Sequence, residues 1–248
     1  MNLEIAVTGV QGVRAAQNGG ANRVELCVGL ELGGLTPSYG LVESVLEAAT
    51  IGVHALIRPR PGDFVYDADM LAIAELETAS IVRQGVAGVV VGLLDASGAI
   101  DHEGTARLIS VARSINPEVE VTFHRAFDQT PDPLAALAVI AELGCTRLLT
   151  SGQAERAGDG LSVLSALTAA QTGVQIMAGG GVTLESIDDL LAVGVDAVHF
   201  SAKRAGEEVA RNTVSLGVAD DTDGPGYFVT DEQLVRTASQ LLTQLHVA

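Results

Sequence analysis

A short charged segment at residues 122–128, Thr-Phe-His-Arg-Ala-Phe-Asp, holds the side chains of this chain best suited to chemistry. It continues an alternating apolar run that ends at Phe123 and has the period of a β-strand. His124, Arg125 and Asp128 then follow within five positions, although only 18% of the residues are charged. A histidine exchanges protons near neutral pH, and an arginine can hold an anion. Because α/β proteins keep such groups at the carboxyl ends of parallel strands, we predict a site here.

A second candidate is the run Ile-Arg-Pro-Arg-Pro-Gly-Asp at residues 57–63. Arg58 and Arg60 stand among rigid prolines, and their planar guanidinium groups suit a carboxylate or a phosphate. In a chain of net charge −17, this run is the best candidate for an anion site. The alternative is that the two arginines simply pair with Glu25 and Asp63.

Small residues after two later apolar runs could complete the anion site. Gly179, Gly180 and Gly181 precede a predicted helix, and glycine-rich backbone at such a point suits a phosphate group. Thr150 and Ser151 would add hydroxyl groups to the same rim. Glycine runs and polar residues also occur in ordinary loops, so both interpretations remain open.

The elements that must position these residues recur along the chain at fairly regular intervals. The runs with a strand pattern are residues 3–7, 23–28, 53–59, 88–94, 120–127, 146–151, 175–180 and 197–202. Helix-like segments lie between them, among them 41–50, 68–84, 104–114 and 133–143, with a last helix at 231–245. Eight strand-then-helix units in about 250 residues predict an α/β fold, a TIM (β/α)8 barrel forming one domain over residues 1–248. A long loop at about 206–230 precedes the last helix, and a doubly wound open sheet is the alternative fold.

Alternation along the strands separates side chains that face the helices from those that face the barrel lumen. The inward set is unusually polar, because a purely structural lumen would hold Val, Ile and Leu. It comprises Glu4, Glu25, Arg58, Thr122, His124, His199 and Ser201. Buried charges must pair with each other or face a solvated pocket. One interpretation is therefore an ion-pair network that holds the barrel together, and this suits Glu4 best.

The other interpretation is a catalytic site at the rim of the barrel. His124 is the first choice for a reacting residue, with Glu25 and His199 as further catalytic candidates. Arg58, Arg60 and Arg125 would hold an anion or stabilise developing negative charge. Asp128 would orient Arg125 or a histidine, and Ser201 would bind substrate.

Composition limits the partners. The net charge of −17 repels nucleic acid and anionic membranes, so we expect neither as a partner. No apolar run approaches the roughly 20 residues of a membrane span, and the N-terminus enters a strand pattern rather than a signal peptide. Cys27 and Cys145 lie far apart, so no disulfide framework or Cys-x-x-Cys metal motif is indicated. We expect a cytoplasmic protein that binds a small molecule or a metal ion.

Six segments are distinctive when taken together. They are residues 23–27 (RVELC), 33–38 (GGLTPS), 57–64 (IRPRPGDF), 123–128 (FHRAFD), 149–152 (LTSG) and 176–181 (IMAGGG). In this order they resemble the CutC family of copper homeostasis proteins, and the resemblance covers roughly residues 1–204. It implies a cytoplasmic TIM barrel, a homo-oligomer (dimer or tetramer), and a role in intracellular copper handling with possible copper binding.

The candidate metal ligands follow from the ion that the resemblance implies. Copper(I) favours Cys and Met, whereas copper(II) favours imidazole with other nitrogen and oxygen ligands. Cys27 and Met177 could point into the lumen and bind the metal, joined by His124 and His199, although none of them stand at a close ligand spacing. Cys27 could equally be a small buried hydrophobe, and Cys145 lies at the opposite end of the barrel.

Two functions therefore remain open. The first is a copper-handling protein. The second is an uncharacterised enzyme that acts on a small anionic substrate, bearing phosphate or carboxylate, or on a polyhydroxylated one, at the C-terminal rim of the barrel.

Overall fold

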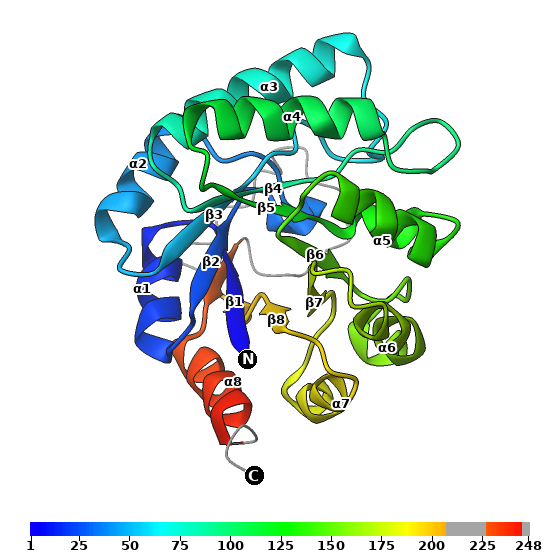
Figure 1. Ribbon diagram of the computed structural model, residues 1–248. Coiled ribbons are helices and arrows are strands. Elements are labelled where there is room, and N and C mark those ends of the chain that lie inside the picture. Colours follow the sequence, from blue (N-terminus) through cyan, green and yellow to red (C-terminus); the bar gives the residue numbers. More distant parts are fainter. Residues whose placement is uncertain (207–226, 245–248) are drawn as a thin grey trace, which may run out of the picture.

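Eight parallel strands form a closed barrel in the computed structural model, and helices surround it (Figure 1). The structure describes residues 1–206 and 227–244. The barrel strands are β1 (Asn2–Val7), β2 (Arg23–Leu26), β3 (Gly52–Leu56), β4 (Gly88–Val91), β5 (Glu120–Phe123), β6 (Arg147–Thr150), β7 (Gln175–Gly179) and β8 (Ala197–Phe200). Each strand pairs with the next in chain order, and β8 pairs with β1 to close the ring. The predicted TIM barrel is confirmed.

Helices connect consecutive strands and lie outside the barrel. They are α1 (Val10–Gly19), α2 (Tyr39–Ala48), α3 (Ala68–Arg83), α4 (His102–Ile115), α5 (Pro133–Glu142), α6 (Leu161–Ala169), α7 (Ile187–Ala192) and α8 (Glu232–Gln244). Local sequence sets several of their starts. The side chains of Asp67, Asp101 and Asp132 accept hydrogen bonds from the first-turn N–H groups of α3, α4 and α5.

The barrel has an apolar outer shell and a polar lumen. In β2, Val24 and Leu26 are fully buried in the main hydrophobic cluster between strands and helices. Arg23 and Glu25, which alternate with them, are buried among polar lumen groups, as the alternation predicts. The apolar shell holds the strands in register, and so fixes the height of each polar side chain inside the lumen.

Part of the lumen is the structural ion-pair network that the sequence allowed for. Near the amino ends of the strands, Arg147 donates to Glu120 Oε2 at 2.9 Å and to Thr122 Oγ1 at 3.1 Å. His54 Nε2 lies 3.5 Å from the same Glu120 carboxylate. Thr122 therefore serves this network, at the end of the barrel away from the predicted site.

Several predicted strands extend too far. β5 ends at Phe123, and Arg125–Gln129 form a 3-10 helix, η2, where the sequence predicted strand up to residue 127. The cause is local, because the Nδ1 atom of His124 accepts the N–H of Ala126 at 3.1 Å and caps that helix. β2 and β3 likewise end at Leu26 and Leu56, earlier than predicted. The early turn after β5 carries Arg125 to the rim of the barrel.

A pair of short strands follows β8. β9 (Lys203–Ala205) pairs antiparallel with β10 (Phe228–Thr230), and the sequence pattern did not predict either strand. Most of the predicted loop at 206–230, and the predicted end of the last helix at residue 245, lie outside the described residues. The loop at 29–38 includes a further 3-10 turn, η1 (Leu30–Leu32).

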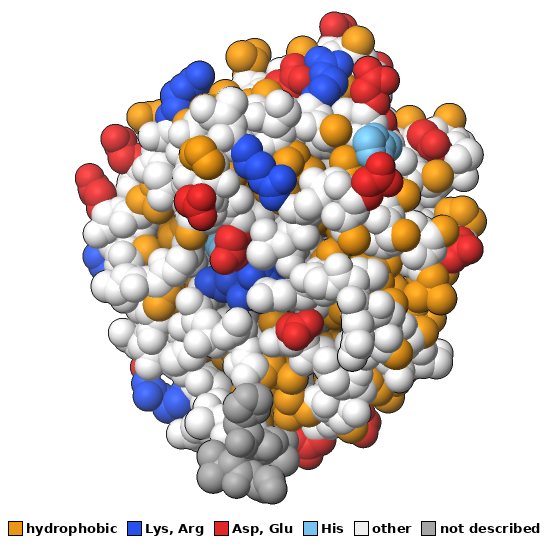
Figure 2. Space-filling view, viewed as in Figure 1, with side chains coloured by type: hydrophobic (Ala, Val, Ile, Leu, Met, Phe, Trp, Pro, Cys, Tyr) orange, Lys and Arg blue, Asp and Glu red, His pale blue; other side chains and the backbone are white. Residues whose placement is uncertain are grey.

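Acidic and basic side chains are interspersed over the face drawn in Figure 2, so the negative net charge is not gathered there in one patch. Among the helices of residues 1–206 and 227–244, none combines the length and apolar character that crossing a membrane requires.

Candidate active site

A cavity of about 590 Å3 lies at the carboxyl ends of the barrel strands, and we call it the rim cavity. Its walls include Glu25 on β2, Arg58 just after β3, His124 just after β5 and His199 on β8. A parallel barrel gathers the carboxyl ends of all its strands on one face. Residues far apart in the sequence therefore meet around this cavity.

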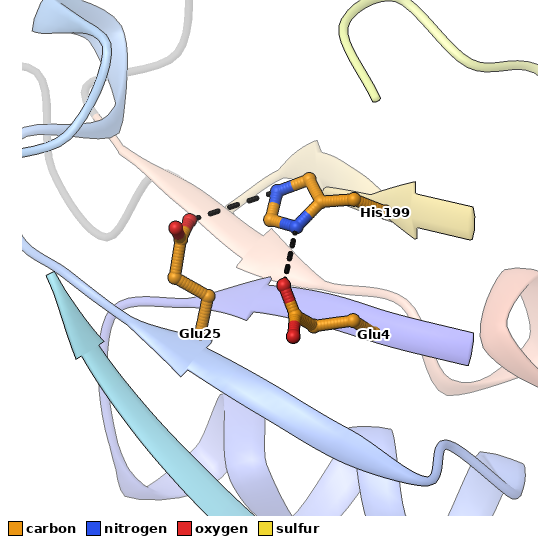
Figure 3. Close-up of side chains that lie close together, drawn as sticks. All are labelled: Glu4, Glu25 and His199. Atoms are coloured by element: carbon orange, nitrogen blue, oxygen red, sulfur yellow. Dashed lines mark hydrogen bonds and ion pairs between the residues drawn. The ribbon is translucent and has the colours of Figure 1, made fainter. Parts of the chain in front are cut away.

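His199, which lines the cavity, lies between the carboxylates of Glu4 and Glu25 (Figure 3). Its Nδ1 atom is 2.9 Å from Glu4 Oε1, and its Nε2 atom is 3.6 Å from Glu25 Oε2. Glu4 and His199 stand directly opposite each other where β1 pairs with β8, and Glu25 projects from β2 on the other side of β1. An imidazole with a carboxylate at each nitrogen is suited to carrying a positive charge, because both nitrogens can then donate.

The charges around Glu4 and His199 reinforce one another. Burial opposes ionisation of Glu4, but the hydrogen bond and charge of His199, together with Arg23, outweigh it and hold the pKa of Glu4 below its ordinary value. Arg23 donates its Nε–H to the other oxygen of Glu4. Burial likewise opposes charging of His199, yet the charge of Glu25 and the hydrogen bond and charge of Glu4 raise its pKa. Glu4 is thus a fixed anion that keeps His199 protonated.

Glu25 behaves differently from Glu4. Burial raises its pKa to about 7, with the charge of His199 acting in the opposite direction and the charge of Glu4 in the same direction. Within the described part of the chain, no hydrogen bond of Glu25 contributes to this shift, whereas Glu4 is held by both Arg23 and His199. Paired titratable groups whose environments push their pKa values apart are typical of acid–base catalysis. Glu25 is therefore the group of the trio that can gain and lose a proton near neutral pH.

His124 does not share that property. Burial, and secondarily the charge of Arg58, lowers its pKa to about 3. Its Nδ1 atom accepts the N–H of Ala126, so the proton of the neutral ring is on Nε2. The acid–base role that we predicted for His124 from the sequence does not suit a ring that stays neutral. A neutral imidazole in this position can donate a hydrogen bond instead.

Arg125 and Asp128 form a braced pair at the edge of the cavity. Arg125 donates from Nε to Asp128 Oδ2 at 2.8 Å and from Nη2 to Ser151 Oγ at 3.0 Å. Asp128 in turn accepts hydrogen bonds from Thr150 Oγ1 and from the N–H and Oγ–H of Ser151. Gly180 has a φ of +102°, and a Cβ there would lie 2.6 Å from the Cζ atom of Arg125. Glycine at this position lets the guanidinium lie against the backbone.

The two arginines of the proline-rich run go to different places. Arg58 is buried, and its Nη atoms donate to the carbonyls of Leu32, Gly34 and Gly62 at 2.9–3.0 Å, while its guanidinium lies 4.9 Å from the centre of the Phe64 ring. Arg60 instead pairs with Asp63 at 2.7 Å and does not line the cavity. The pairing alternative therefore holds for Arg60, because the turn after Arg58 directs its neighbour outward.

The structure sorts the other predicted residues in the same way. Those that line the rim cavity are Glu25, Arg58, His124, Arg125, Asp128, Gly180, Gly181, His199 and Ser201. Those that do not line it are Arg60, Thr150, Ser151, Gly179, Cys27 and Met177. Thr150 and Ser151 act through Asp128, and Gly179 lies against His199, where a Cβ would be 2.9 Å from that residue's Cβ.

Sequence reasoning missed some cavity residues. Phe64 and Lys203 line the cavity, yet neither was predicted as a site residue. Phe64 follows the proline-rich run directly, and Lys203 comes just after the strand that carries His199. Their closeness in sequence to predicted site residues was the available signal.

Comparison with known proteins places the chain in a family. The profile of the CutC family matches residues 1–204. The chain belongs to the CutC family. A CutC family protein from Vibrio vulnificus (strain YJ016) is 44% identical over 226 residues, which cover 89% of this chain and 90% of that protein. A CutC family protein from Yersinia pseudotuberculosis serotype I is 40% identical over 245 residues, covering 97% of this chain and 95% of the relative.

A solved structure agrees with the CutC assignment. The chain is similar to the crystal structure of a Streptococcus agalactiae protein provisionally named as the copper homeostasis protein CutC. The TM-score is 0.74 at 30% sequence identity, and the match covers 81% of this chain and 98% of that one.

The name of the CutC family raises the question of copper ligands. Met177 accepts a hydrogen bond from Arg23 Nη2 at 3.1 Å, and Cys27 follows Arg23 four residues later, just beyond the end of β2. Four residues along a strand span about 13 Å. The two sulfur atoms also lie in separate apolar clusters, with Leu56 and Val90 around Cys27 and Leu149 and Ala197 around Met177. The two soft donors therefore do not form a joint copper(I) site.

The remaining donor set is hard. Among the described residues, Glu4, Glu25 and His199 are the one group of three whose ligand atoms all lie within 4.8 Å of one another. Glu4 in this group is already bound by Arg23, and His199 by Glu4. Copper(I) is a soft ion that prefers sulfur ligands, so a set made mostly of carboxylate oxygens does not suit it. Arg23 also competes with any metal ion for the carboxylate of Glu4. These residues do not fit a copper(I) centre.

Proposed function

We propose that this CutC family chain is an enzyme that transfers a proton on a small anionic or polyhydroxylated substrate bound in the rim cavity. The observation that carries the proposal is that two glutamates beside His199, Glu4 and Glu25, have pKa values shifted in opposite directions. Glu4 is held ionised by Arg23 and His199, whereas burial brings the pKa of Glu25 to about 7. Such a division of roles is what general acid–base catalysis needs at neutral pH.

The positive groups of the cavity support an anionic substrate. Arg125 and Lys203 line the edge of the cavity, and Arg58 is buried in its wall. They stand in a chain of net charge −17, where scattered surface cations would be of little use for anion binding. Gly180 and Gly181 both have positive φ angles, and Gly180 brings the backbone close to Arg125. We infer that Arg125 and Lys203 hold the charged end of the substrate, with Ser201 beside them.

The experiment that tests the proposal measures exchange of carbon-bound hydrogen in the substrate for deuterium from the solvent. Full-length protein is incubated in deuterated water with a panel of small hydroxyaldehydes, hydroxyketones and sugar acids, each with and without a phosphate. Loss of C–H signals is measured by proton NMR. We expect exchange or isomerisation of at least one anionic member, reduced roughly 10²–10⁴-fold in Glu25→Gln.

A matched control is available on α3. Like Glu25, Glu77 has a pKa raised by burial, although it is only half-buried, and it does not line the cavity. Glu77→Gln should leave the exchange unchanged. Equal exchange by wild type and Glu25→Gln on every compound would overturn the proposal.

Copper handling is the function that the family name carries. The name of the Streptococcus agalactiae protein supports it, while Cys27 and Met177, in separate apolar clusters, do not supply a joint copper(I) site. We propose copper handling only as an indirect role, in which the product of the reaction affects copper, or as transient binding of copper by the protein. A cytoplasmic location and a homo-oligomeric state, both implied by the family, are part of this proposal and await fractionation and light scattering.

A further inference from the structure

Two residues that line the rim cavity each carry a buried hydrogen-bond donor that lacks a partner within residues 1–206 and 227–244. Among the described residues, the Nε2 atom of His124 and the Nε atom of Arg58 are buried without a hydrogen-bond partner. The two residues are only 5% and 6% exposed, and both line the cavity. Buried donors are nearly always paired, so a buried donor left over beside a cavity points to an acceptor on a ligand.

The ring of His124 is held in one orientation. Its Nδ1 atom accepts the N–H of Ala126 at 3.1 Å, which leaves the proton on Nε2. Gly92 lies against the ring, since a Cβ there would come within 2.3 Å of the His124 Cε1 and Nδ1 atoms. Phe64 packs on the ring with 5.0 Å between ring centres. The donor is thus fixed before any ligand arrives.

Arg58 is fixed in the same neighbourhood. Both of its Nη atoms donate, to the carbonyls of Leu32, Gly34 and Gly62, whereas its Nε–H has no partner among the described residues. The guanidinium lies 4.9 Å from the centre of the same Phe64 ring that contacts His124. The two spare donors therefore flank one aromatic side chain. The pair combines one neutral and one positive donor, which suits an oxygen that becomes negative during a reaction.

We propose that His124 and Arg58 donate to the carbonyl oxygen of the substrate, and that the substrate is therefore a small aldehyde or ketone with a C–H next to its C=O. This inference rests on the proposed function and narrows its substrate class. Glu25 removes the proton from the carbon beside the carbonyl, and the C–H electron pair moves to give an enolate. His124 and Arg58 stabilise the enolate oxygen by hydrogen bonds. Return of the proton to the same carbon gives exchange. Where that carbon also carries a hydroxyl group, the hydroxyl proton moves to the enolate oxygen, and protonation of the former carbonyl carbon then gives the isomeric carbonyl compound.

A neutral donor is appropriate for this step. An imidazolium would hand its proton over to the enolate, whereas a neutral Nε2–H can hold the oxyanion and keep its proton. Burial lowers the pKa of His124 to about 3, in agreement with this role. His124 would then contact the reacting atoms without exchanging a proton itself.

The first test uses an enediolate mimic on the intact chain. Glycolohydroxamate is added to protein labelled with ¹⁵N at histidine, and the His124 signals are assigned by comparison with His124→Gln. We expect the Nε2–H proton to move downfield and to exchange more slowly with water, while the ring nitrogens keep the pattern of a neutral imidazole. An unchanged His124 signal at saturating mimic, or no binding of the mimic, would overturn the inference.

The second test separates the inference from the proposed function. His124→Gln should lower deuterium exchange of the carbonyl substrate by roughly 10²–10³-fold, with the pH dependence that Glu25 sets left in place. Full exchange in His124→Gln alongside lost exchange in Glu25→Gln would refute the carbonyl donor and leave the proton-transfer enzyme standing. Full exchange in both variants would remove the proposed function itself. Thermal melting of each variant confirms that it is folded.

Discussion

His199 and Glu4 face each other in register at the seam where β8 closes the barrel onto β1, with 2.9 Å between Nδ1 and Oε1. Glu4 is fully buried and also binds Arg23, so one carboxylate joins the first, second and last strands. Stability and chemistry therefore meet in a single side chain.

Glu4→Gln should destabilise the fold by about 3–5 kcal/mol, because it leaves the buried Arg23 without its counter-charge. The free energy of unfolding from urea titration measures the loss. The double variant Glu4→Gln/Arg23→Met should recover part of it, since both charges are then gone. A double variant less stable than Glu4→Gln would contradict the ion-pair explanation.

Glu25 should make stability depend on pH. Its pKa is raised from 4.5 to about 7, so the folded state holds this proton more tightly than the unfolded state does. The contribution is complete below pH 4.5 and disappears as pH rises through about 7. Wild type should therefore lose up to about 3 kcal/mol relative to Glu25→Gln between pH 4.5 and 8. Urea titrations of both proteins across this window measure it, and parallel curves would count against the raised pKa.

Gly92→Ala should displace the His124 ring and destabilise the protein by about 1–3 kcal/mol, because a methyl group at this position overlaps the imidazole. Gly40 in α2 is the matched control, since nothing lies within 4 Å of a Cβ built there. Gly40→Ala should be neutral or slightly stabilising. Urea titration compares the two, and equal effects at both positions would mean that the His124 contact carries no strain.

Arg125→Met should weaken binding of inorganic phosphate roughly 10- to 100-fold, the loss expected for a charge-assisted hydrogen bond. Asp128→Asn should weaken it less, because it loosens the guanidinium without removing it. Arg60→Met is the control, since Arg60 pairs with Asp63 away from the cavity. Calorimetric titration gives the affinities. Weaker phosphate binding in Arg60→Met than in Arg125→Met would move the anion site to the proline-rich turn.

Copper(I) titration under reducing conditions tests the metal ligands predicted from the family resemblance. We expect no saturable site that loses affinity in both Cys27→Ser and Met177→Leu, because the two side chains occupy different clusters. Burial also raises the pKa of the Cys27 thiol, which disfavours the thiolate that binds metals. A stoichiometric site abolished by either substitution would show that the barrel rearranges to bring the sulfurs together.

The barrel could be predicted from the sequence because the strand and helix patterns are local and recur eight times. Alternation in β2 and β8 was enough to turn Glu25 and His199 inward. It could not show that Glu4 contacts His199, since that contact depends on closure between the first and last strands. For the same reason Glu4 was given a structural role alone.

The alternation of apolar and polar residues could not predict where each strand ends or how the pKa values of the buried groups shift. The side chain of His124 ends β5 by capping the next turn, and that same hydrogen bond selects its tautomer. Arg58 and Arg60 were predicted together as one anion site because both stand among prolines. Residue type alone could not show that the proline-rich turn places Arg60 beside Asp63, away from Arg58. Burial depth, which separates the roles of His124 and Glu25, appears only once the barrel is assembled.

The β9–β10 pair has a practical consequence for work on this molecule. The backbone N–H of Gly206 donates to the carbonyl of Tyr227 at 2.9 Å, and that of Asp231 donates to Ala202 at 2.8 Å. The first bond joins the two segments three residues beyond Lys203, which lines the cavity, and the second joins them one residue before it. A fluorophore attached at Gly206 would thus be only three residues along the chain from a residue that lines the cavity, while leaving the barrel strands untouched. These two backbone hydrogen bonds make Gly206 a suitable attachment site for a reporter of ligand binding.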